Sequence, residues 1–205
     1  GLISQKVAQD LIRVVPYGIE VSRYAAKIQP WDGQRPLRLL FVGGVTVRKG
    51  VQYLYEALRL LNHPKVEARV VGPVALSAAA QEKFREVAQL TGHVARHEVR
   101  QHYQWADLFV FPSICEGSAT VTYEALASGL PVITTPNAGS VVRDGVDGFI
   151  VPIRDPEALA ARIDLLASDP GLLAAMSRNA RERGQEFSWE KYYYNLSNTL
   201  IDLFI

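Results

Sequence analysis

Two acidic residues stand eight positions apart in the segment CEGSATVTYEALASGLP, residues 115–131. Glu116 comes just before an apolar, helix-like run, and Glu124 lies inside that run. If the segment were helical throughout, a rise of about 1.5 Å per residue would spread the pair over about 12 Å. A carboxylate pair that hydrolyses one glycosidic bond needs a separation of about 5 to 9.5 Å. The spacing therefore favours two carboxylates at opposite ends of an elongated ligand.

Carboxylates accept hydrogen bonds from vicinal hydroxyls, so a sugar at one end and a ribose at the other is the simplest interpretation of this pair. Plainer interpretations remain open for each acid. Glu116 could be a loop acid at the start of a helix, and Glu124 could be an acid on the surface of that helix.

A second segment, FVGGVTVRKG at 41–50, has features of a phosphate-binding turn. Gly43 and Gly44 leave the backbone bare for close approach of an anion, and Lys49 precedes a helix that we expect to begin near Gly50. The order Lys-Gly does not match a Walker A loop, and the spacing is not that of a dinucleotide fingerprint. The alternatives are a tight turn at the glycines and a solvated lysine, although a cation at a helix start needs a compensating anion.

The loop Glu116-Gly117-Ser118 leads into another helix, which we expect to begin between Ser118 and Thr120. The free N–H groups of a helix N-terminus bind anions. Together with the helix start near Gly50, this loop suggests a diphosphate ligand.

Other clusters fail as catalytic or metal-binding motifs. After His97-Glu98, Gln101 stands where the zincin pattern needs histidine, no Asp-x-Asp pair is present, and Asp144 to Asp147 is typical of a turn. We interpret the polar residues between 93 and 102 as part of a solvated loop: His93, Arg96, His97, Glu98 and His102. The sequence therefore predicts no metal site.

No nucleophile stands in a catalytic context either. Ser113 and Cys115 lie outside any G-x-S-x-G motif, and we expect Cys115 to be a small buried thiol. Three arginines are expected to form a solvated helix face: Arg178, Arg181 and Arg183.

The composition limits the classes of partner. With 205 residues, 48% of them hydrophobic, and a formal charge of +1, the chain fits one large domain and carries no global field that would recruit nucleic acid. One cysteine suits a reducing compartment, and the first residues lack a signal-peptide pattern. Because the chain begins without methionine, we expect it to be part of a longer protein.

From Leu37 onward, short apolar runs alternate with segments of helical periodicity. The strongest predicted strands are 37–43, 67–72, 107–112 and 131–135, and 93–97 and 148–152 are weaker ones. Predicted helices at 50–61, 75–90, 99–106 and 121–128 lie between them. This alternation predicts an α/β fold with a Rossmann-like doubly wound parallel sheet in three α/β/α layers, and ligands outside the carboxyl ends of the strands.

Three more helices are expected after Pro152, at 155–168, at 171–184 and from 188 onward, with Asp155 and Ser188 as N-caps. The last helix carries an apolar and aromatic stripe: Trp189, Tyr193, Leu196, Leu200 and Phe204. Such a stripe usually packs in a core, and the alternative is docking on a domain absent from this chain.

Taken together, these motifs resemble the C-terminal, donor-binding domain of the retaining, nucleotide-sugar-dependent glycosyltransferases of family 4, or group 1 glycosyltransferases. FVGGVTVRKGV, ADLFVFPSICEG, EALASGLPVITT and GVDGFIVP follow the family's order and intervals, between VVPYGIE and FSWEKYYYNL. The resemblance covers nearly the whole chain and implies one half of a two-domain B fold. We expect a linker with a short strand at 1–36, the nucleotide-sugar-binding domain at 37–187, and a C-terminal helix at 188–205 that docks on the absent N-terminal domain.

The resemblance also implies roles for residues. Lys49 would bind the donor diphosphate and Glu124 the ribose, while Glu116, first acid of the E-x7-E motif, would lie beside the transferred sugar and act with Lys49 in catalysis. Backbone N–H groups for the phosphate and sugar would come from the second loop, Gly117, Ser118 and Ala119, and Gly43 and Gly44 would also line the donor site. Many family members have an arginine at the position of Gly44, and Arg48 is a nearby substitute that does not match that position.

We therefore expect a metal-independent retaining glycosyltransferase domain that needs no cofactor, takes a UDP- or GDP-linked sugar, and contributes to making a polysaccharide or glycoconjugate. The glycan or lipid-linked acceptor would bind the absent domain, so this chain alone would turn over poorly. We expect a cytoplasmic location, with peripheral contact at the inner face of the membrane as an open alternative. The competing hypothesis is a non-catalytic nucleotide or nucleotide-sugar binding module. The set of Lys49, Glu116 and Glu124 argues against an epimerase or phosphorylase.

Overall fold

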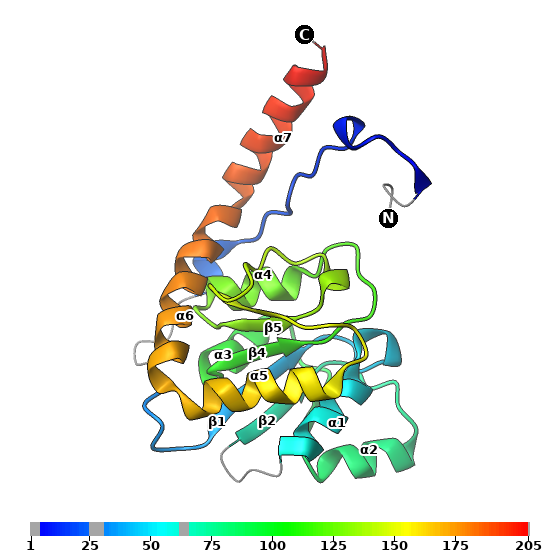
Figure 1. Ribbon diagram of the computed structural model, residues 1–205, viewed down its shortest axis with the longest axis vertical. Coiled ribbons are helices and arrows are strands. Elements are labelled where there is room, and N and C mark those ends of the chain that lie inside the picture. The colour runs from blue at the N-terminus through cyan, green and yellow to red at the C-terminus, as the bar shows by residue number, and fades with distance from the viewer. Residues whose placement is uncertain (1–4, 25–30, 62–65, 205) are drawn as a thin grey trace.

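The computed structural model describes residues 5–24, 31–61 and 66–204. Its centre is a parallel six-stranded sheet in the order β3-β2-β1-β4-β5-β6 (Figure 1). The strands are β1 (Leu37–Val42), β2 (Val66–Val71), β3 (Gln89–Gly92), β4 (Leu108–Phe111), β5 (Val132–Thr134) and β6 (Gly148–Ile150). The order reverses between β1 and β4, which defines a doubly wound sheet and confirms the predicted fold class.

The central strands are apolar along their whole length because both faces of the sheet are covered. Every residue of β4 is buried, and so are all residues of β1 except Arg38. Stacked rings of Phe41, Phe109 and Phe111 fill the space around the junction of β1 and β4. A half-exposed strand would have alternated apolar and polar residues, so the continuous apolar runs in the sequence were sufficient to place these strands.

The third strand was predicted at the wrong residues. The sequence suggested a helix over 75–90 and a strand at 93–97, whereas helix α2 covers Ala78–Arg85 and β3 follows at Gln89–Gly92. Residues 93–97 instead lie in a loop and turn, in which the Glu98 carboxylate accepts a hydrogen bond from the N–H of Ala95 at 2.9 Å. β3 is an edge strand with an exposed or half-buried side chain at every position, so it lacks the apolar run that marks a central strand.

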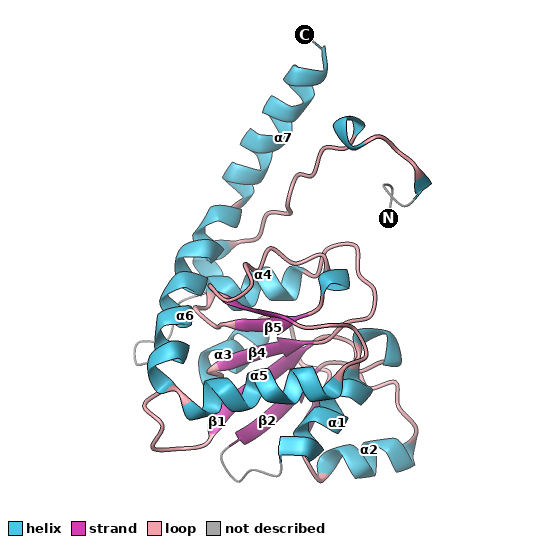
Figure 2. Cartoon of the chain, in the orientation of Figure 1, coloured by secondary structure: helices cyan, strands magenta, loops and turns pink. Residues whose placement is uncertain are grey.

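Helices cover both faces of the sheet (Figure 2). α1 (Val51–Leu61) connects β1 to β2, α3 (Val99–Trp105) leads into β4, and α4 (Thr120–Ala127) connects β4 to β5. Because connections in parallel sheets are right-handed, reversal of the strand order puts α1 and α4 on opposite faces. Helix α5 (Pro156–Ser168) packs beside α1, and α6 (Pro170–Gly184) packs beside α4.

The predicted helix caps are confirmed in this C-terminal part. The Asp155 side chain accepts from the N–H of Ala158 at 2.8 Å, and Ser188 Oγ accepts from the N–H of Lys191 at 3.3 Å. Asp169 caps α6 in the same way, with Pro170 at the first helical position. Each cap satisfies an N–H group that has no partner inside its helix.

The final helix, α7 (Trp189–Phe204), rises away from the sheet (Figure 1). The prediction that its stripe packs in the core of this chain is wrong, because Trp189 is 36% exposed, Tyr193 60% and Leu200 47%. No described helix combines the length and apolar composition that crossing a membrane requires.

The N-terminal segment reaches the body at the start of α7. The N–H of Ile19 donates to the carbonyl of Phe187 at 2.8 Å, and the Tyr17 ring stacks on Tyr192. The strand expected in the first 36 residues is, within the described residues, only a bridge between Ile19 and Ser188. A side chain at Gly18 would meet the Trp189 ring at 2.8 Å, so glycine at this position permits the contact.

Asp107 joins the linker to the sheet ahead of β4. Its carboxylate accepts two hydrogen bonds from the Arg35 guanidinium, at 2.6 and 2.8 Å, and one from the N–H of Arg38 at 3.0 Å. The side chain of Asp107 is 1% exposed and that of Arg35 is 33% exposed. A buried carboxylate is tolerated only when it is paired in this way.

Replacing Asp107 with alanine should lower the free energy of unfolding by about 2 kcal/mol, because Arg35 loses a buried, bidentate partner. The loss is smaller than for a fully buried pair, since Arg35 stays partly in water. Urea unfolding followed by circular dichroism measures the change. Asp164→Ala on the exposed face of α5 is the matched control, with an expected change within about 0.5 kcal/mol. Equal changes in the two variants would contradict a stabilising role for the Asp107 pair.

Candidate functional site

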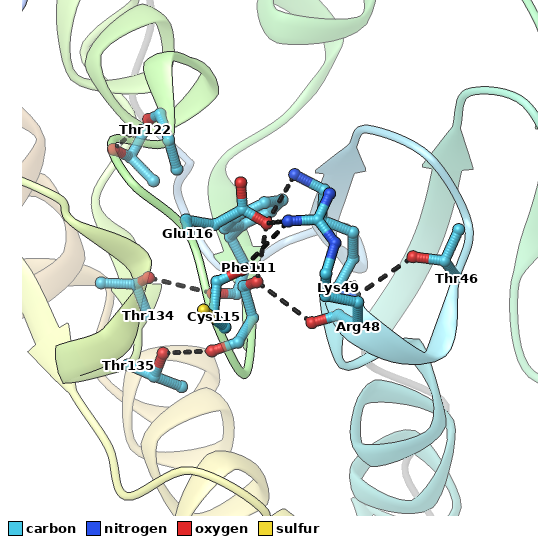
Figure 3. A network of polar contacts seen from close by, with 11 residues as sticks. Thr46, Arg48, Lys49, Phe111, Cys115, Glu116, Thr122, Thr134 and Thr135 are labelled. Atoms are coloured by element: carbon cyan, nitrogen blue, oxygen red, sulfur yellow. Dashed lines mark hydrogen bonds and ion pairs between the residues drawn. The ribbon is translucent and has the colours of Figure 1, made fainter.

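The candidate site lies where the strand order reverses. Lys49 ends a short 3-10 turn, η4 (Val47–Lys49), which follows β1, and Glu116 lies in the loop that follows β4. Because β1 and β4 are parallel neighbours, the loops at their carboxyl ends meet. Figure 3 shows the two loops with Lys49, Arg48 and Glu116 directed toward one another. Ligands of doubly wound sheets bind at this crevice.

Three donors converge on one oxygen of Glu116. Its Oε1 lies 2.7 Å from Lys49 Nζ and 3.1 Å from Arg48 Nη1. The hydroxyl of Ser113 donates to the same Oε1 at 3.1 Å. The side chains of Lys49 and Glu116 are 18% and 11% exposed, whereas that of Arg48 is 61% exposed. The pair is thus largely removed from water, and Arg48 extends it toward solvent.

These contacts describe the environment of the two residues whose roles the sequence left open. Lys49 is not a solvated lysine, and its Nζ also lies 5.3 Å from the centre of the Phe111 ring. Glu116 is the compensating anion that a cation near a helix start was expected to need. The glutamate precedes helix α4 rather than belonging to it, so its separation from Glu124 is not set by helical rise.

A glycine brings the two loops into contact. Gly50 has φ +73°, and a Cβ at this position would stand 1.9 Å from the carbonyl oxygen of Pro112. The N–H of Ile114 donates to the carbonyl of Arg48 at 3.0 Å across the same junction. Any side chain at position 50 would therefore push the Lys49 turn away from the β4 loop.

A second glycine does the same for the start of α4. Gly139 has φ +59°, and a Cβ on it would lie 2.3 Å from the carbonyl oxygen of Gly117. The neighbouring backbone fixes the loop, because Glu116 donates its N–H to Asn137 O at 2.9 Å and Ala119 donates its N–H to Ala138 O at 3.0 Å. The sequence named Gly50 only as the expected start of a helix and did not single out Gly139, and each of these glycines ends a short 3-10 turn.

The predicted backbone donors differ in their availability. The N–H of Gly43 donates to Val71 O at 2.9 Å, and that of Ala119 to Ala138 O, so these two are occupied. Among the described residues, the N–H groups of Gly44, Gly117 and Ser118 donate to no protein oxygen. The expectation that Ala119 contributes a free N–H group is therefore not met, while the N–H groups of Gly44, Gly117 and Ser118 can bind an anion.

Glu124 lies on α4 in a different environment. Tyr103 on α3, which is fully buried, donates its hydroxyl to Glu124 Oε2 at 2.8 Å, and Tyr24 from the N-terminal segment also donates to this carboxylate. Burial raises the pKa of Glu124 above its usual value, although the two tyrosine hydrogen bonds oppose this shift. The same burial, with the nearby Glu124 charge, raises the pKa of both tyrosines.

Glu124 faces a pocket and is not an exposed acid on a helix. The pocket has a volume of about 290 Å³, and Arg96 and Arg23 also line it. Sequence reasoning missed Tyr24 and Tyr103, because nothing in the residue types shows that two aromatic hydroxyls from distant segments meet one carboxylate.

The rejected cluster at 93–102 does not converge. His97 and Arg96 line a basic pocket with Arg23 and Arg100, whereas Nδ1 of His102 lies 3.4 Å from Arg69 Nη1. Burial, together with Arg69, lowers the pKa of His102. No group of three possible metal ligands is found in the described parts of the chain.

Two further expectations are wrong. Cys115 is exposed rather than buried, because the site loop turns its side chain outward while Arg48 binds its carbonyl at 3.1 Å. Arg183 is not a solvated helix residue, since it donates to Val141 O at 3.1 Å, pairs with Glu186 and stacks on Phe187. Arg178 and Arg181 are exposed as expected.

Comparison with known proteins identifies related chains. The family model "Glycosyl transferases group 1" matches residues 36–169. D-inositol 3-phosphate glycosyltransferase from Geodermatophilus obscurus is 32% identical over 204 residues, which cover 87% of this chain and 44% of that protein. The chain thus spans about half the length of the curated relatives it matches.

Solved structures share the fold. Sucrose-phosphate synthase from Thermosynechococcus elongatus matches with a TM-score of 0.77 and 25% identity, over 94% of this chain and 52% of that one. HepE from Anabaena, solved in complex with UDP and glucose, matches with a TM-score of 0.75 and 23% identity, over 97% of this chain and 59% of that one.

The raised pKa of Glu124 predicts a pH-dependent stability. A carboxyl whose pKa is higher in the folded state binds more protons there, so its contribution to the free energy of unfolding falls as pH rises above about 4.5. Glu124→Gln should therefore stabilise the fold at pH 7, and this gain should shrink when urea unfolding is repeated at pH 4. Gln101→Ala, at an exposed and uncharged position of α3, serves as the control and should change the free energy of unfolding by the same amount at both pH values.

Proposed function

This chain belongs to the group 1 glycosyltransferases, and on that premise we propose that it binds the donor of a glycosyl transfer, a nucleotide diphosphate sugar. The observation that carries the proposal is the meeting of Lys49, Arg48 and Glu116 where the strand order reverses. The diphosphate would lie against the two loops, with the sugar near Glu116 and the ribose near Glu124.

The diphosphate end of the donor matches the charges at the β1 loop. Lys49 supplies a cation, and the unoccupied N–H groups of Gly44, Gly117 and Ser118 supply donors. Such fixed donors stabilise the negative charge that develops on a leaving diphosphate. We propose that these groups take the place of a metal ion in this domain.

Arg48 is the best candidate for a second cation. Gly44 stands where many family members carry an arginine, and Arg48 reaches the same loop junction from the other end of the turn. Its side chain is 61% exposed and its Nη1 lies 3.1 Å from Glu116 Oε1, so it can reach a phosphate in the crevice without leaving water. We therefore assign the missing charge to Arg48.

The ribose end matches the pocket at Glu124. Its carboxylate lines the pocket while Tyr103 holds Oε2, which leaves acceptor capacity for vicinal hydroxyls. Arg96 beside it provides a planar donor group for the remainder of the nucleoside.

The sugar end and the acceptor are proposed from the family. Glu116 would orient the transferred sugar, and transfer would retain the anomeric configuration. Since the matched relatives are about twice as long as this chain, acceptor contacts are assigned to a further domain. A longer protein that contains this chain, incubated with donor and acceptor, would reveal the configuration of the product by NMR.

Lys49→Ala should abolish measurable binding of UDP and GDP in calorimetry, because the lysine is the least exposed cation of the site. Lys83→Ala on α2, an exposed lysine, should bind as the unchanged protein does. Binding should persist in EDTA. If no nucleotide diphosphate binds the unchanged chain, or if Lys49→Ala binds equally well, the assigned site is wrong.

Glu124 should distinguish ribose from deoxyribose. The unchanged protein should bind UDP more tightly than 2′-deoxy-UDP, by roughly tenfold for a charge-assisted hydrogen bond. Glu124→Gln should bring the two affinities together, with little change for deoxy-UDP. A variant that lost both nucleotides in equal proportion would instead assign Glu124 a structural role.

A further inference from the structure

Glu116 already neutralises the cations that the proposed function assigns to the diphosphate. Oε1 accepts from Lys49, Arg48 and Ser113 at 2.7, 3.1 and 3.1 Å. One carboxylate oxygen is therefore surrounded by the donors that an anionic ligand would use (Figure 3). The single positive charge of Lys49 is therefore already paired with a carboxylate, and a phosphate that approaches it meets the negative charge of Glu116 as well.

We propose that Glu116 and the donor diphosphate compete for the same cations. This proposal rests on the proposed function. When the donor binds, Lys49 and Arg48 move from the carboxylate to the phosphates, and Glu116 is released toward the sugar. Glu116 thereby sets the selectivity of the site for ligands with enough negative charge to displace it.

Because the site is largely buried, Lys49 and Glu116 can separate only when each charge gains a new partner. Separating Lys49 from Glu116 in a site where their side chains are 18% and 11% exposed would leave two poorly solvated charges. A diphosphate removes the penalty on the lysine because it replaces the lost anion. Sugar hydroxyls that donate to Glu116 remove part of the penalty on the carboxylate.

The geometry also predicts which ligands fail to displace Glu116. A neutral sugar or nucleoside brings no charge for Lys49, so the ion pair stays intact. A ligand with a diphosphate supplies several acceptor oxygens, which can satisfy Lys49 and Arg48 together. Glu116 would therefore be presented to a sugar chiefly when that sugar arrives attached to a diphosphate.

A substitution that removes only the charge tests the competition. Glu116→Gln keeps the size and an acceptor oxygen of the side chain but removes its negative charge. Because the competing anion is gone, calorimetry should show at least a threefold tighter association with both inorganic pyrophosphate and UDP. Glu116→Asp retains the negative charge near the cations and should gain less affinity than Glu116→Gln. Thermal unfolding of each variant checks that the fold is intact.

A control variant separates the local effect of Glu116 from the general effect of removing one negative charge. Glu67→Gln removes one negative charge near the opposite end of the sheet, where Glu67 lies 3.7 Å from Arg38, and should leave both affinities unchanged. If the unchanged chain binds UDP but Glu116→Gln binds it equally or more weakly, Glu116 positions Lys49 instead, and the competition is overturned while the proposed function stands. If neither pyrophosphate nor UDP binds any of these proteins, both are overturned.

Discussion

The parallel pairing of β1 with β4 is the constraint on which the site depends. It places the first strand of one half of the sheet beside the first strand of the other. The strands that follow β1 are added on one side of this pair, and those that follow β4 are added on the other side. The loops that follow these two strands have no helix between them. Residues 67 positions apart, Lys49 and Glu116, can then form a short ion pair in a largely desolvated position.

Sequence patterns predicted the parts of the molecule whose environment is uniform. The central strands lie under helices on both faces, so their apolar runs are continuous and their ends are clear. The proximity of Lys49 and Glu116 was predictable for a related reason, since each lies in the loop after such a strand, and parallel strands bring these loops together. The caps at Asp155 and Ser188 depend only on local backbone chemistry.

Other features depend on contacts between distant segments, which residue types do not reveal. The edge strand β3 has too little buried surface to be distinguished from the end of a helix. The meeting of Tyr24 and Tyr103 at Glu124 requires the path of the N-terminal segment. Exposure of Cys115 follows from the direction of one loop, and exposure of the α7 stripe depends on what surrounds that helix.

The contact of Gly50 with the Pro112 carbonyl joins two loops through main-chain atoms alone. Main-chain contacts do not change with side-chain rotamers, so the spacing between the two loops is a property of the backbone. Side chains on these loops can therefore change rotamer, and with it their partners, while the main chain that carries them stays in register.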